Sequence, residues 1–316
     1  MRTALFGADA IGAGWAADRP VFGRTLPDVP GVPPDPDAHP EERTRREVAR
    51  RLRRAGCVFA EDEARLLVEA AATPAGLAAL VGRRVAGEPL EHVLGWAELC
   101  GLRFAVAPGV FVPRRRTELL VRRAAALARP GAVVVDLCCG SGAVGAAVAA
   151  TVAAAAARPV ELHAADIDPV AVRCARRNLA AVPGPGGRCL DCRGNVHQGD
   201  LDAALPAALA GRVDVLVANV PYVPTGALGL LPPEARDHEP RVALDGGPDG
   251  LDLVRRVAAV APRWLAPGGH LLVETSDDQA EAAAGIMAGA GLAPDVAHDA
   301  ALDATVVTGR AGSGGS

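Results

Sequence analysis

From Ala132 onward the sequence alternates short apolar runs with helical segments, and this alternation most constrains how the chain can fold. Apolar runs of five or six residues are typical of strands that are buried on both faces, as in parallel sheets. Because parallel neighbours need a crossover, usually a helix, the pattern predicts an α/β fold with a doubly wound, mostly parallel sheet. We expect strands at 133–137, 162–166, 195–198, 213–218, 270–274 and 304–309, the last paired with a strand near Val296.

The composition supports a globular protein with a core of small aliphatic side chains. Half of the 316 residues are hydrophobic but only 3% are aromatic, so Ala, Val and Leu must fill the interior. That length allows one large domain and a smaller one. All 33 basic residues are arginine, which indicates a compositional bias and lowers the positional meaning of any single arginine. The net charge of −4 gives no reason to expect a polyanion as main partner, so we expect no stable nucleic-acid binding.

The segment ahead of the sheet predicts a small helical domain and a linker. Helices are expected at 41–55, 61–72 and 74–85, with Thr73 as an N-cap. Short alternating segments around Pro108-Gly109 predict a β-hairpin. The expected domains are a disordered leader (1–40), an N-terminal helical substrate-docking domain (41–97), a hairpin linker (98–116), the main domain (117–310) and a flexible tail (311–316).

Two further features bear on location and partners. The alanine-rich run at 143–157 is too short and too weakly apolar to span a bilayer, so we expect no membrane contact. We expect the protein to be cytoplasmic and monomeric. The helix at 41–55 carries seven arginines, which form either a docking face for an acidic partner or RNA, or a solvated surface.

The seven cysteines are odd in number and scattered, which suits reduced thiols better than a disulfide framework. Cys189-x-x-Cys192 has the spacing of half a zinc site. No second pair follows at finger-like spacing, and of the histidines only His197 is near. We therefore expect no metal.

The four residues Asn219-Val220-Pro221-Tyr222 follow a buried strand and are the main candidate for a reactive site. A polar residue at the carboxyl end of such a strand faces the crevice where open α/β sheets bind ligands. Pro221 stiffens the backbone, and the only tyrosine of the chain presents a flat ring beside the Asn219 carboxamide. The pattern predicts a clamp for a planar, hydrogen-bonding group.

A glycine-rich turn predicts a nucleotide-like ligand at the end of the first strand of the sheet. Gly140-x-Gly142-x-x-Gly145, with Asp166 about twenty residues on, fits a dinucleotide site or an S-adenosylmethionine site equally well. Asp136 favours the second reading, because a carboxylate suits a cationic ligand and repels a pyrophosphate. Asp136 could alternatively cap the following turn. Asp200-Leu201 could meet an adenine ring, or either residue could cap a helix starting near residue 202.

Together these motifs resemble the class I methyltransferases, and within them the HemK-type protein-(glutamine-N5) methyltransferases, in an actinobacterial side branch. The resemblance covers about residues 88–309. Ahead of the sheet it rests on Glu88-Pro89-Leu90 with Gly95 and on Phe111-Val112-Pro113-Arg114 with Thr117-Glu118. Within the sheet region it rests on the motifs at 136–142, 166, 200–201 and 219–222. It also rests on a downstream pattern, His238-Glu239-Pro240, Ala243-Leu244, Gly247 and Asp249-Gly250-Leu251.

The resemblance implies a Rossmann-like fold of seven strands, S-adenosylmethionine as cofactor, and the glutamine of the Gly-Gly-Gln loop of a class I peptide-chain release factor as substrate. It implies catalytic roles for Asn219, Val220, Pro221 and Tyr222. The implied cofactor-binding residues are Asp136, Leu137, Cys138, Cys139, Gly140, Gly142, Asp166, Asp200, Leu201 and Asn219.

The chain departs from the family pattern at several of these positions. Val220 replaces the first proline of an Asn-Pro-Pro-Tyr signature, and Cys138-Cys139 replaces a small Gly-Thr pair. Arg115-Arg116 stands where a proline and an acid are expected, and Thr275-Ser276 after Glu274 is also unusual. These departures affect the identity of the substrate more than the chemistry.

The proposed chemistry is an amide clamp. The Asn219 side-chain oxygen and the Val220 carbonyl would each accept a hydrogen from the glutamine NH₂, which fixes the direction of the nitrogen. An N6-adenine methyltransferase acting on DNA or RNA is the main alternative, because an exocyclic amine presents the same two hydrogens. An NAD-dependent dehydrogenase would explain the glycines but not residues 219–222.

Overall fold

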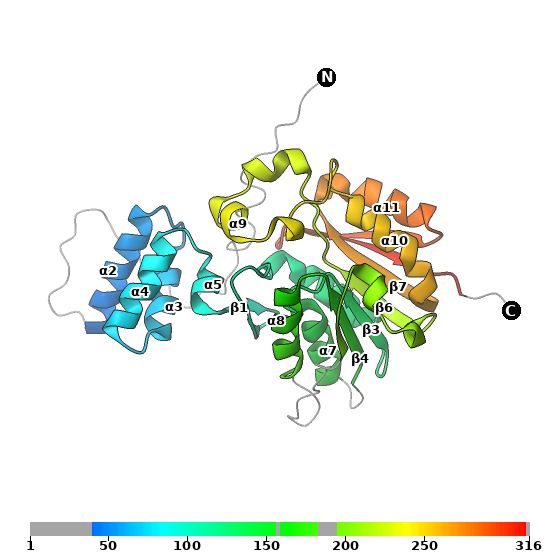
Figure 1. Ribbon diagram of the computed structural model, residues 1–316, viewed down its shortest axis with the longest axis horizontal. Coiled ribbons are helices and arrows are strands. Elements are labelled where there is room, and N and C mark those ends of the chain that lie inside the picture. The colour runs from blue at the N-terminus through cyan, green and yellow to red at the C-terminus, as the bar shows by residue number, and fades with distance from the viewer. Residues whose placement is uncertain (1–39, 156–158, 183–194, 314–316) are drawn as a thin grey trace, which may run out of the picture. The chain divides into compact units, whose positions relative to one another are not determined.

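The computed structural model describes residues 40–155, 159–182 and 195–313 (Figure 1). These residues fall into two compact units, which meet in the sequence between Gly95 and Trp96. The predicted leader, apart from Pro40, lies outside the described residues, as do Cys189, Cys192 and the tail from residue 314 onward. Within the described part, no helix has the length and apolarity needed to cross a membrane.

The first unit is helical, and the three predicted helices are present with ends that shift by at most two residues. Thr73 caps one of them, because its side-chain oxygen accepts a hydrogen bond from the Gly76 N–H at 3.0 Å. Leu52 and Leu67 are fully buried between the helices. A short fourth helix, which we did not predict, ends at Gly95 in a left-handed conformation. The helices are α2 (Pro40–Arg54), α3 (Ala60–Ala70), α4 (Pro74–Val85) and α5 (Leu90–Leu94).

A buried ion pair joins two helices of this unit. The Arg84 guanidinium donates to both carboxylate oxygens of Glu63, at 2.7 and 3.2 Å, and both side chains are 4% exposed. The arginine also donates to the Glu88 carbonyl at 3.1 Å. A buried charge needs such partners, because it has lost its hydration.

The second unit holds a seven-stranded sheet within the described residues, which confirms the predicted fold class. Its order is β5-β4-β3-β6-β7-β9-β8, with β9 antiparallel to both neighbours and the other pairs parallel. The strands are β3 (Val133–Leu137), β4 (Glu161–Asp166), β5 (Val196–Gln198), β6 (Val213–Ala218), β7 (Leu265–Thr275), β8 (Ala293–Asp299) and β9 (Ala304–Arg310).

Helices cover both faces of the sheet (Figure 1). Successive residues of β3 point to opposite faces, so Val134 lies in one core cluster while Val133 and Val135 lie in the other. Side chains of α6 (Glu118–Leu127), α7 (Ala143–Ala155) and α8 (Pro169–Leu179) fill the first cluster. Those of α10 (Asp252–Trp264) and α11 (Ala280–Gly289) fill the second.

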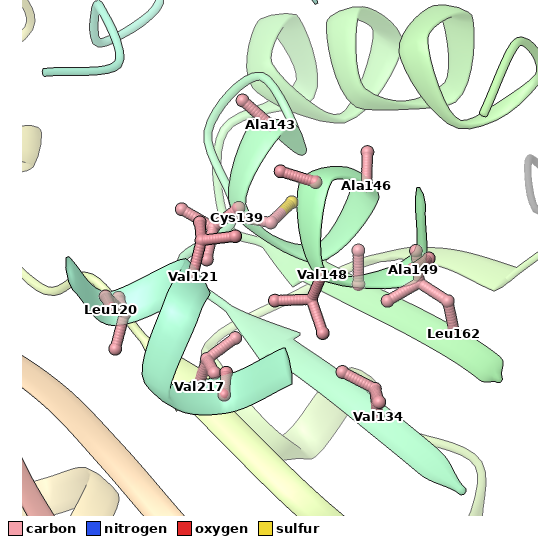
Figure 2. Packing of buried hydrophobic residues seen from close by; sticks show 14 of the residues in the cluster. Leu120, Val121, Val134, Cys139, Ala143, Ala146, Val148, Ala149, Leu162 and Val217 are labelled. Atoms are coloured by element: carbon pink, nitrogen blue, oxygen red, sulfur yellow. The ribbon is translucent and has the colours of Figure 1, made fainter. Parts of the chain in front are cut away.

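The alanine-rich helix α7 packs closely on the sheet because its side chains are small. Figure 2 shows Ala146, Val148 and Ala149 of α7 gathered around Val134 and Leu162 of the neighbouring strands. The helix is buried around most of its circumference, which explains why its sequence has no amphipathic pattern.

The predicted hairpin is present, but the predicted position of its turn is wrong. The structure pairs β1 (Trp96–Leu99) with β2 (Leu102–Ala105), so the turn is Cys100-Gly101 and not Pro108-Gly109. Both turn residues have positive φ, 52° and 73°, as a tight two-residue hairpin requires. Pro108-Gly109 forms a separate turn, in which the Val110 N–H donates to the Ala107 carbonyl.

Glu63 provides a test of the helical unit. Glu63→Ala is expected to lower the free energy of unfolding by about 3–5 kcal/mol, because it leaves a buried guanidinium without its charge partner. Glu69→Ala removes a solvent-exposed pair with Arg65 and should cost less than about 1 kcal/mol. Urea denaturation followed by far-ultraviolet circular dichroism measures both, and equal losses would contradict a structural role for the buried pair.

Candidate functional site

Strand register brings the predicted site residues to one edge of the sheet. Leu137 of β3 pairs with Ala165 of β4 and with Ala218 of β6, and Ala218 pairs with Val273 of β7. The chain moves outward from β3 to β4 and β5 and then returns to β6 on the other side of β3. The residues that follow these paired positions therefore flank the point where the strand order reverses, which is where open α/β sheets bind ligands. They are Cys138, Asp166, Asn219 and Glu274.

The glycine turn after β3 is held by the acid at the end of β4. Asp166 Oδ2 accepts a hydrogen bond from the Gly140 N–H at 2.8 Å, and its Oδ1 accepts one from the Asp168 N–H at 2.9 Å. Burial raises the pKa of Asp166, while these backbone donors lower it. Cys138 and Gly140 both have φ near 55°, a left-handed conformation, which gives a physical reason for a glycine at position 138 in relatives.

Asp136 is fully buried beneath this turn. Its Oδ2 accepts a hydrogen bond from the Gly145 N–H at 2.8 Å, as the alternative prediction of a capping role requires. A Cβ at Gly145 would lie 3.0 Å from the carboxylate, so any other residue would require the carboxylate to shift. Asp136 Oδ1 has no hydrogen-bond partner in the described part of the chain. Burial raises the pKa of Asp136, and the nearby charge of Asp166 adds a smaller increase. The hydrogen bond from Gly145 lowers the pKa, and the resulting pKa is about 7.

The remaining predicted cofactor-binding residues differ in how far their side chains are exposed to solvent. Leu137 and Leu201 have buried side chains in the hydrophobic core, and Gly142 packs against Leu179 of α8. The Asp200 carboxylate is half exposed and accepts a hydrogen bond from Arg256 at 2.8 Å, but it accepts none from the backbone of the short 3₁₀ turn Leu201–Ala204. Its alternative role as a helix cap is therefore wrong. Ile167, which we did not predict, follows Asp166 with a side chain 53% exposed.

The two cysteines of the turn are not suited to nucleophilic chemistry. Burial raises the pKa of Cys138 to about 12, and burial raises the pKa of Cys139 well above its usual value. Both thiols are thus protonated at neutral pH. Within the described residues, no group of three or more histidine, cysteine or acidic side chains is arranged to hold a metal ion.

Asn219 presents a free acceptor at the end of β6. Its Nδ2 donates a hydrogen bond to Thr117 Oγ1 at 3.4 Å, while no donor among the described residues reaches its Oδ1. The Val220 side chain is 1% exposed and belongs to the core. No donor in the described part of the chain bonds to the Val220 carbonyl. The site therefore offers a side-chain oxygen and a neighbouring backbone oxygen.

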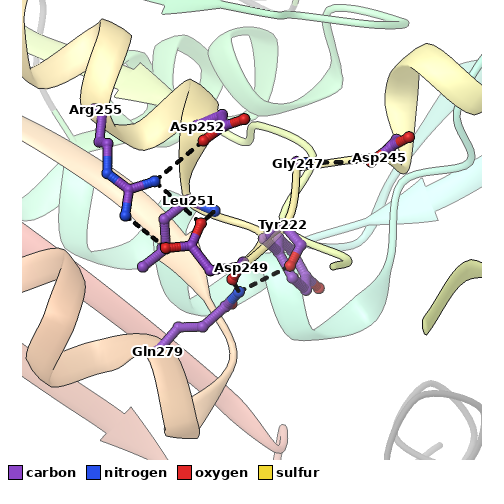
Figure 3. Close-up of polar contacts among 8 residues, drawn as sticks. All are labelled: Tyr222, Asp245, Gly247, Asp249, Leu251, Asp252, Arg255 and Gln279. Carbon is purple, nitrogen blue, oxygen red and sulfur yellow. Dashed lines mark hydrogen bonds and ion pairs between the residues drawn. The ribbon is translucent and has the colours of Figure 1, made fainter. Parts of the chain in front are cut away.

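A downstream glycine segment clamps the backbone of this motif, as Figure 3 shows around Tyr222. The Gln279 side-chain amide donates to the carbonyls of Tyr222 and Asp249, at 2.9 and 3.0 Å. The Gly246 N–H donates to the Val223 carbonyl at 2.9 Å, and a Cβ at Gly246 would lie 2.6 Å from the Pro221 oxygen. The Gln279 contact with Asp249 gives one part of the downstream sequence pattern a structural role, which we had not predicted.

The Tyr222 ring lies in a network of charged side chains. Its hydroxyl donates to Glu274 Oε1 at 3.4 Å, and the Arg116 guanidinium carbon is 6.0 Å from the ring centroid. Burial raises the pKa of Tyr222 above its usual value. Burial also raises the pKa of Glu274, although Arg116 and the hydroxyls of Thr117 and Tyr222 favour its charged form. The sequence resemblance places the segment with Thr117 over the active site, but it predicts no contact of Arg116, Thr117 or Glu274 with Asn219 or Tyr222.

A second ion pair ties the segment after the hairpin to the region downstream of Tyr222. Arg114 donates to Glu239 Oε1 at 2.6 Å, and the Val112 N–H donates to the same oxygen at 3.2 Å. The Arg114 guanidinium carbon also lies 5.2 Å from the Phe111 ring centroid. The family motifs at 111–114 and 238–240 are therefore two sides of one contact.

Comparison with known proteins agrees with this geometry. The family model of the methyltransferase small domain matches residues 101–228. A release factor glutamine methyltransferase from Geobacter sulfurreducens is 40% identical over 212 residues, which cover 67% of this chain and 69% of the relative. One from Mycolicibacterium smegmatis is 41% identical over 221 residues, covering 68% of this chain and 73% of the relative. The chain belongs to the release factor glutamine methyltransferase family. The resemblance inferred from the motifs is thus confirmed.

A further relative is named for a different substrate, a free amino acid. The 4-amino-L-phenylalanine/4-methylamino-L-phenylalanine methyltransferase of Streptomyces pristinaespiralis is 42% identical over 201 residues. The alignment covers 61% of this chain and 63% of that relative. The chain is therefore about equally similar to release factor glutamine methyltransferases and to a protein named for a free amino acid.

The backbone clamp can be tested through its glycines. Gly250 has φ of 79°, and a Cβ there would overlap the Tyr222 carbonyl oxygen and the Gln279 amide. Gly250→Ala should therefore lower the free energy of unfolding by roughly 1–3 kcal/mol through overpacking, with about 1–2 kcal/mol more from the left-handed backbone. Gly229→Ala, where the added atom meets nothing within 4 Å, is the matched control and should change it by less than about 0.5 kcal/mol. Chemical denaturation measures both, and a neutral Gly250→Ala would show that the clamp is not needed.

Proposed function

We propose that the chain transfers a methyl group from S-adenosylmethionine to the side-chain amide nitrogen of a glutamine in the Gly-Gly-Gln loop of a class I peptide-chain release factor. The observation that carries the proposal is the pair of free acceptors, Asn219 Oδ1 and the Val220 carbonyl, beside the glycine turn of β3. The names of the relatives support the substrate. The helical unit, Pro40 to Gly95, is then the part that docks the release factor.

The residues at the end of β3 fit a cationic cofactor. Asp136 is buried, carries an oxygen without a partner and has a raised pKa, so its charged form gains from a nearby positive group. A pyrophosphate would meet this carboxylate unfavourably. When bound, S-adenosylmethionine supplies an electrophilic methyl carbon on a sulfonium. Asp136 and the turn at Cys138–Gly142 would hold its amino acid part.

The neighbouring strand ends fit the rest of the cofactor. Asp166 keeps lone pairs for ribose hydroxyls while it holds the glycine turn. Ile167 offers exposed apolar surface for an adenine face. Asp200 has an exposed carboxylate with one oxygen paired to Arg256, and its other oxygen is available to an adenine amino group.

On the acceptor side, the chain's residues position a weak nucleophile. An amide nitrogen shares its lone pair with the carbonyl, so its direction matters more than a strong base. Asn219 Oδ1 and the Val220 carbonyl would accept the two hydrogens of the NH₂ group, while Pro221 and Tyr222 pack against the amide plane. Positioning of this kind can supply on the order of 7–11 kcal/mol of the barrier. Valine supplies the same carbonyl as the proline of the signature, so Val220 is compatible with this role.

A free amino acid that carries an aromatic amine is the second candidate substrate. It is favoured by the relative from Streptomyces pristinaespiralis and by the departures at Arg115-Arg116 and Val220. An aromatic amine presents the same two hydrogens to the same two acceptors. Catalytic roles for the four residues 219–222 are required by both candidates.

Asn219→Ala tests the acceptor assignment. Turnover should fall by about 100-fold or more, because the nitrogen loses one of its two positioning contacts. The dissociation constant of S-adenosylmethionine, measured by calorimetry, should change little. Near-normal turnover by this variant would remove Asn219 from the reaction.

Labelled S-adenosylmethionine distinguishes the substrates. We expect label on a release factor and none on its variant with Ala in place of the loop glutamine. Free 4-amino-L-phenylalanine tests the second candidate, and duplex DNA and RNA test the adenine alternative. Label on nucleic acid alone would overturn both proposals.

The raised pKa of Asp136 predicts pH-dependent cofactor binding. Below about pH 7 the carboxyl is protonated and cannot attract a cation, whereas above that pH it is charged. The affinity for S-adenosylmethionine should therefore rise with pH up to about 7, by at most tenfold per unit, and level off above it. Calorimetry in buffers of different ionisation enthalpy should detect proton release on binding near neutral pH.

Asp136→Asn is the control for this pH dependence. It keeps the shape of the side chain but cannot titrate, so its weaker affinity should be flat between pH 6 and 8. An equally steep pH profile in wild type and Asp136→Asn would assign the titration to another group.

A further inference from the structure

Arg116 is a largely buried cation whose hydrogen-bonding capacity is unused. Its side chain is 19% exposed, and its closest acidic partner is Glu274, with Nε 3.9 Å from Oε1. Within the described residues, no carbonyl, carboxylate or hydroxyl oxygen accepts a hydrogen bond from its guanidinium. Arg114, two residues earlier, differs, because it donates to Glu239 at 2.6 Å.

The guanidinium of Arg116 carries five N–H donors. None of its nitrogens is among the buried, unpartnered side-chain atoms of the described residues, so the free donors are open to solvent. Glu274 provides charge compensation at 3.9 Å but no hydrogen bond, and the Tyr222 ring provides one face at 6.0 Å. The donors that remain are available to a bound molecule.

Arg116 lies next to the place where the methyl acceptor would bind. It adjoins Thr117, whose hydroxyl accepts the hydrogen bond of Asn219, and it faces Tyr222. Both neighbours belong to the proposed acceptor site. A group held by Arg116 would therefore be part of the substrate, close to its reacting nitrogen.

The sign of the charge indicates what that group is. The family pattern has an acid at this position, where this chain has Arg116, so the local charge is reversed. An acid there would repel a carboxylate, whereas a guanidinium binds one through two parallel hydrogen bonds. The free donors of Arg116 therefore suit a substrate that carries a negative charge at this place.

We propose that Arg116 is a specificity residue that binds a carboxylate of the methyl acceptor beside the nitrogen held by Asn219. The carboxylate is either the α-carboxylate of a free amino acid or an acidic side chain in the loop of a protein substrate. Glu274 is then a positioning residue, which keeps the guanidinium and the Tyr222 hydroxyl in place. The inference rests on the proposed methyl transfer at Asn219.

The test compares acceptors with and without the carboxylate. The probes are 4-amino-L-phenylalanine and its methyl ester, and a release factor with and without Asp→Asn and Glu→Gln changes in the loop that carries the glutamine. Wild type, Arg116→Met, Arg116→Lys and the matched control Arg115→Met are assayed for kcat/KM. Binding of each acceptor to the complex with S-adenosylhomocysteine is measured as well.

Wild type and Arg115→Met should prefer the carboxylate form of one acceptor pair by about 10- to 100-fold, the range for a hydrogen-bonded charge pair. Arg116→Met should lose that preference while keeping its affinity for S-adenosylhomocysteine. Arg116→Lys should recover part of the preference, because a lysine keeps the positive charge but cannot donate two parallel hydrogen bonds as a guanidinium does. The acceptor pair that shows the effect identifies the source of the carboxylate.

Failure of this inference differs from failure of the proposed function. If wild type methylates an acceptor and Arg116→Met keeps the same preference for its carboxylate form, Arg116 does not bind that carboxylate. If wild type binds the carboxylate forms through Arg116 but methylates none of them, Arg116 is a carboxylate-binding residue and the proposed function is wrong. If wild type shows no preference in either binding or turnover, the inference is overturned.

Discussion

The parallel pairing of β3 with β6 is the constraint on which the site depends. Because Leu137 and Ala218 are partners in register, the glycine turn after one strand and Asn219 after the other start side by side. A slip of one residue would turn the side chains of β6 to the opposite faces and move Asn219 away from the turn. Because both faces of the sheet are apolar, hydrophobicity alone does not set this register, and the fit of the individual side chains in the two core clusters has to prevent such a slip.

Much of this arrangement could be predicted from the sequence. The elements β3, β6 and α4 have the predicted bounds, because apolar runs and a proline at the start of a helix are strong local signals. The partners Thr117, Glu274 and Gln279 were not predictable in the same way. They reach the motif from elements far away in the sequence, and only the strand register brings them there.

The errors have local physical causes. Pro108-Gly109 has the composition of a hairpin turn, whereas the actual turn places a cysteine at positive φ, which few non-glycine residues adopt. Strand β7 begins at Leu265 and not at the predicted residue 270, so it includes Pro267-Gly268-Gly269. Position 267 lies near the start of the strand, where a missing N–H is tolerated.

The clamp around Tyr222 acts on backbone oxygens, and this has a consequence for how such chains are recognised. Every residue can supply the carbonyl at position 220, so the side chain there is limited only by its packing in the core. At Gly246 and Gly250 the clamp requires the absence of a side chain, which only glycine provides. A search that requires two consecutive prolines after the asparagine therefore misses this chain, whereas a search that requires glycines at these two distances from the asparagine finds it.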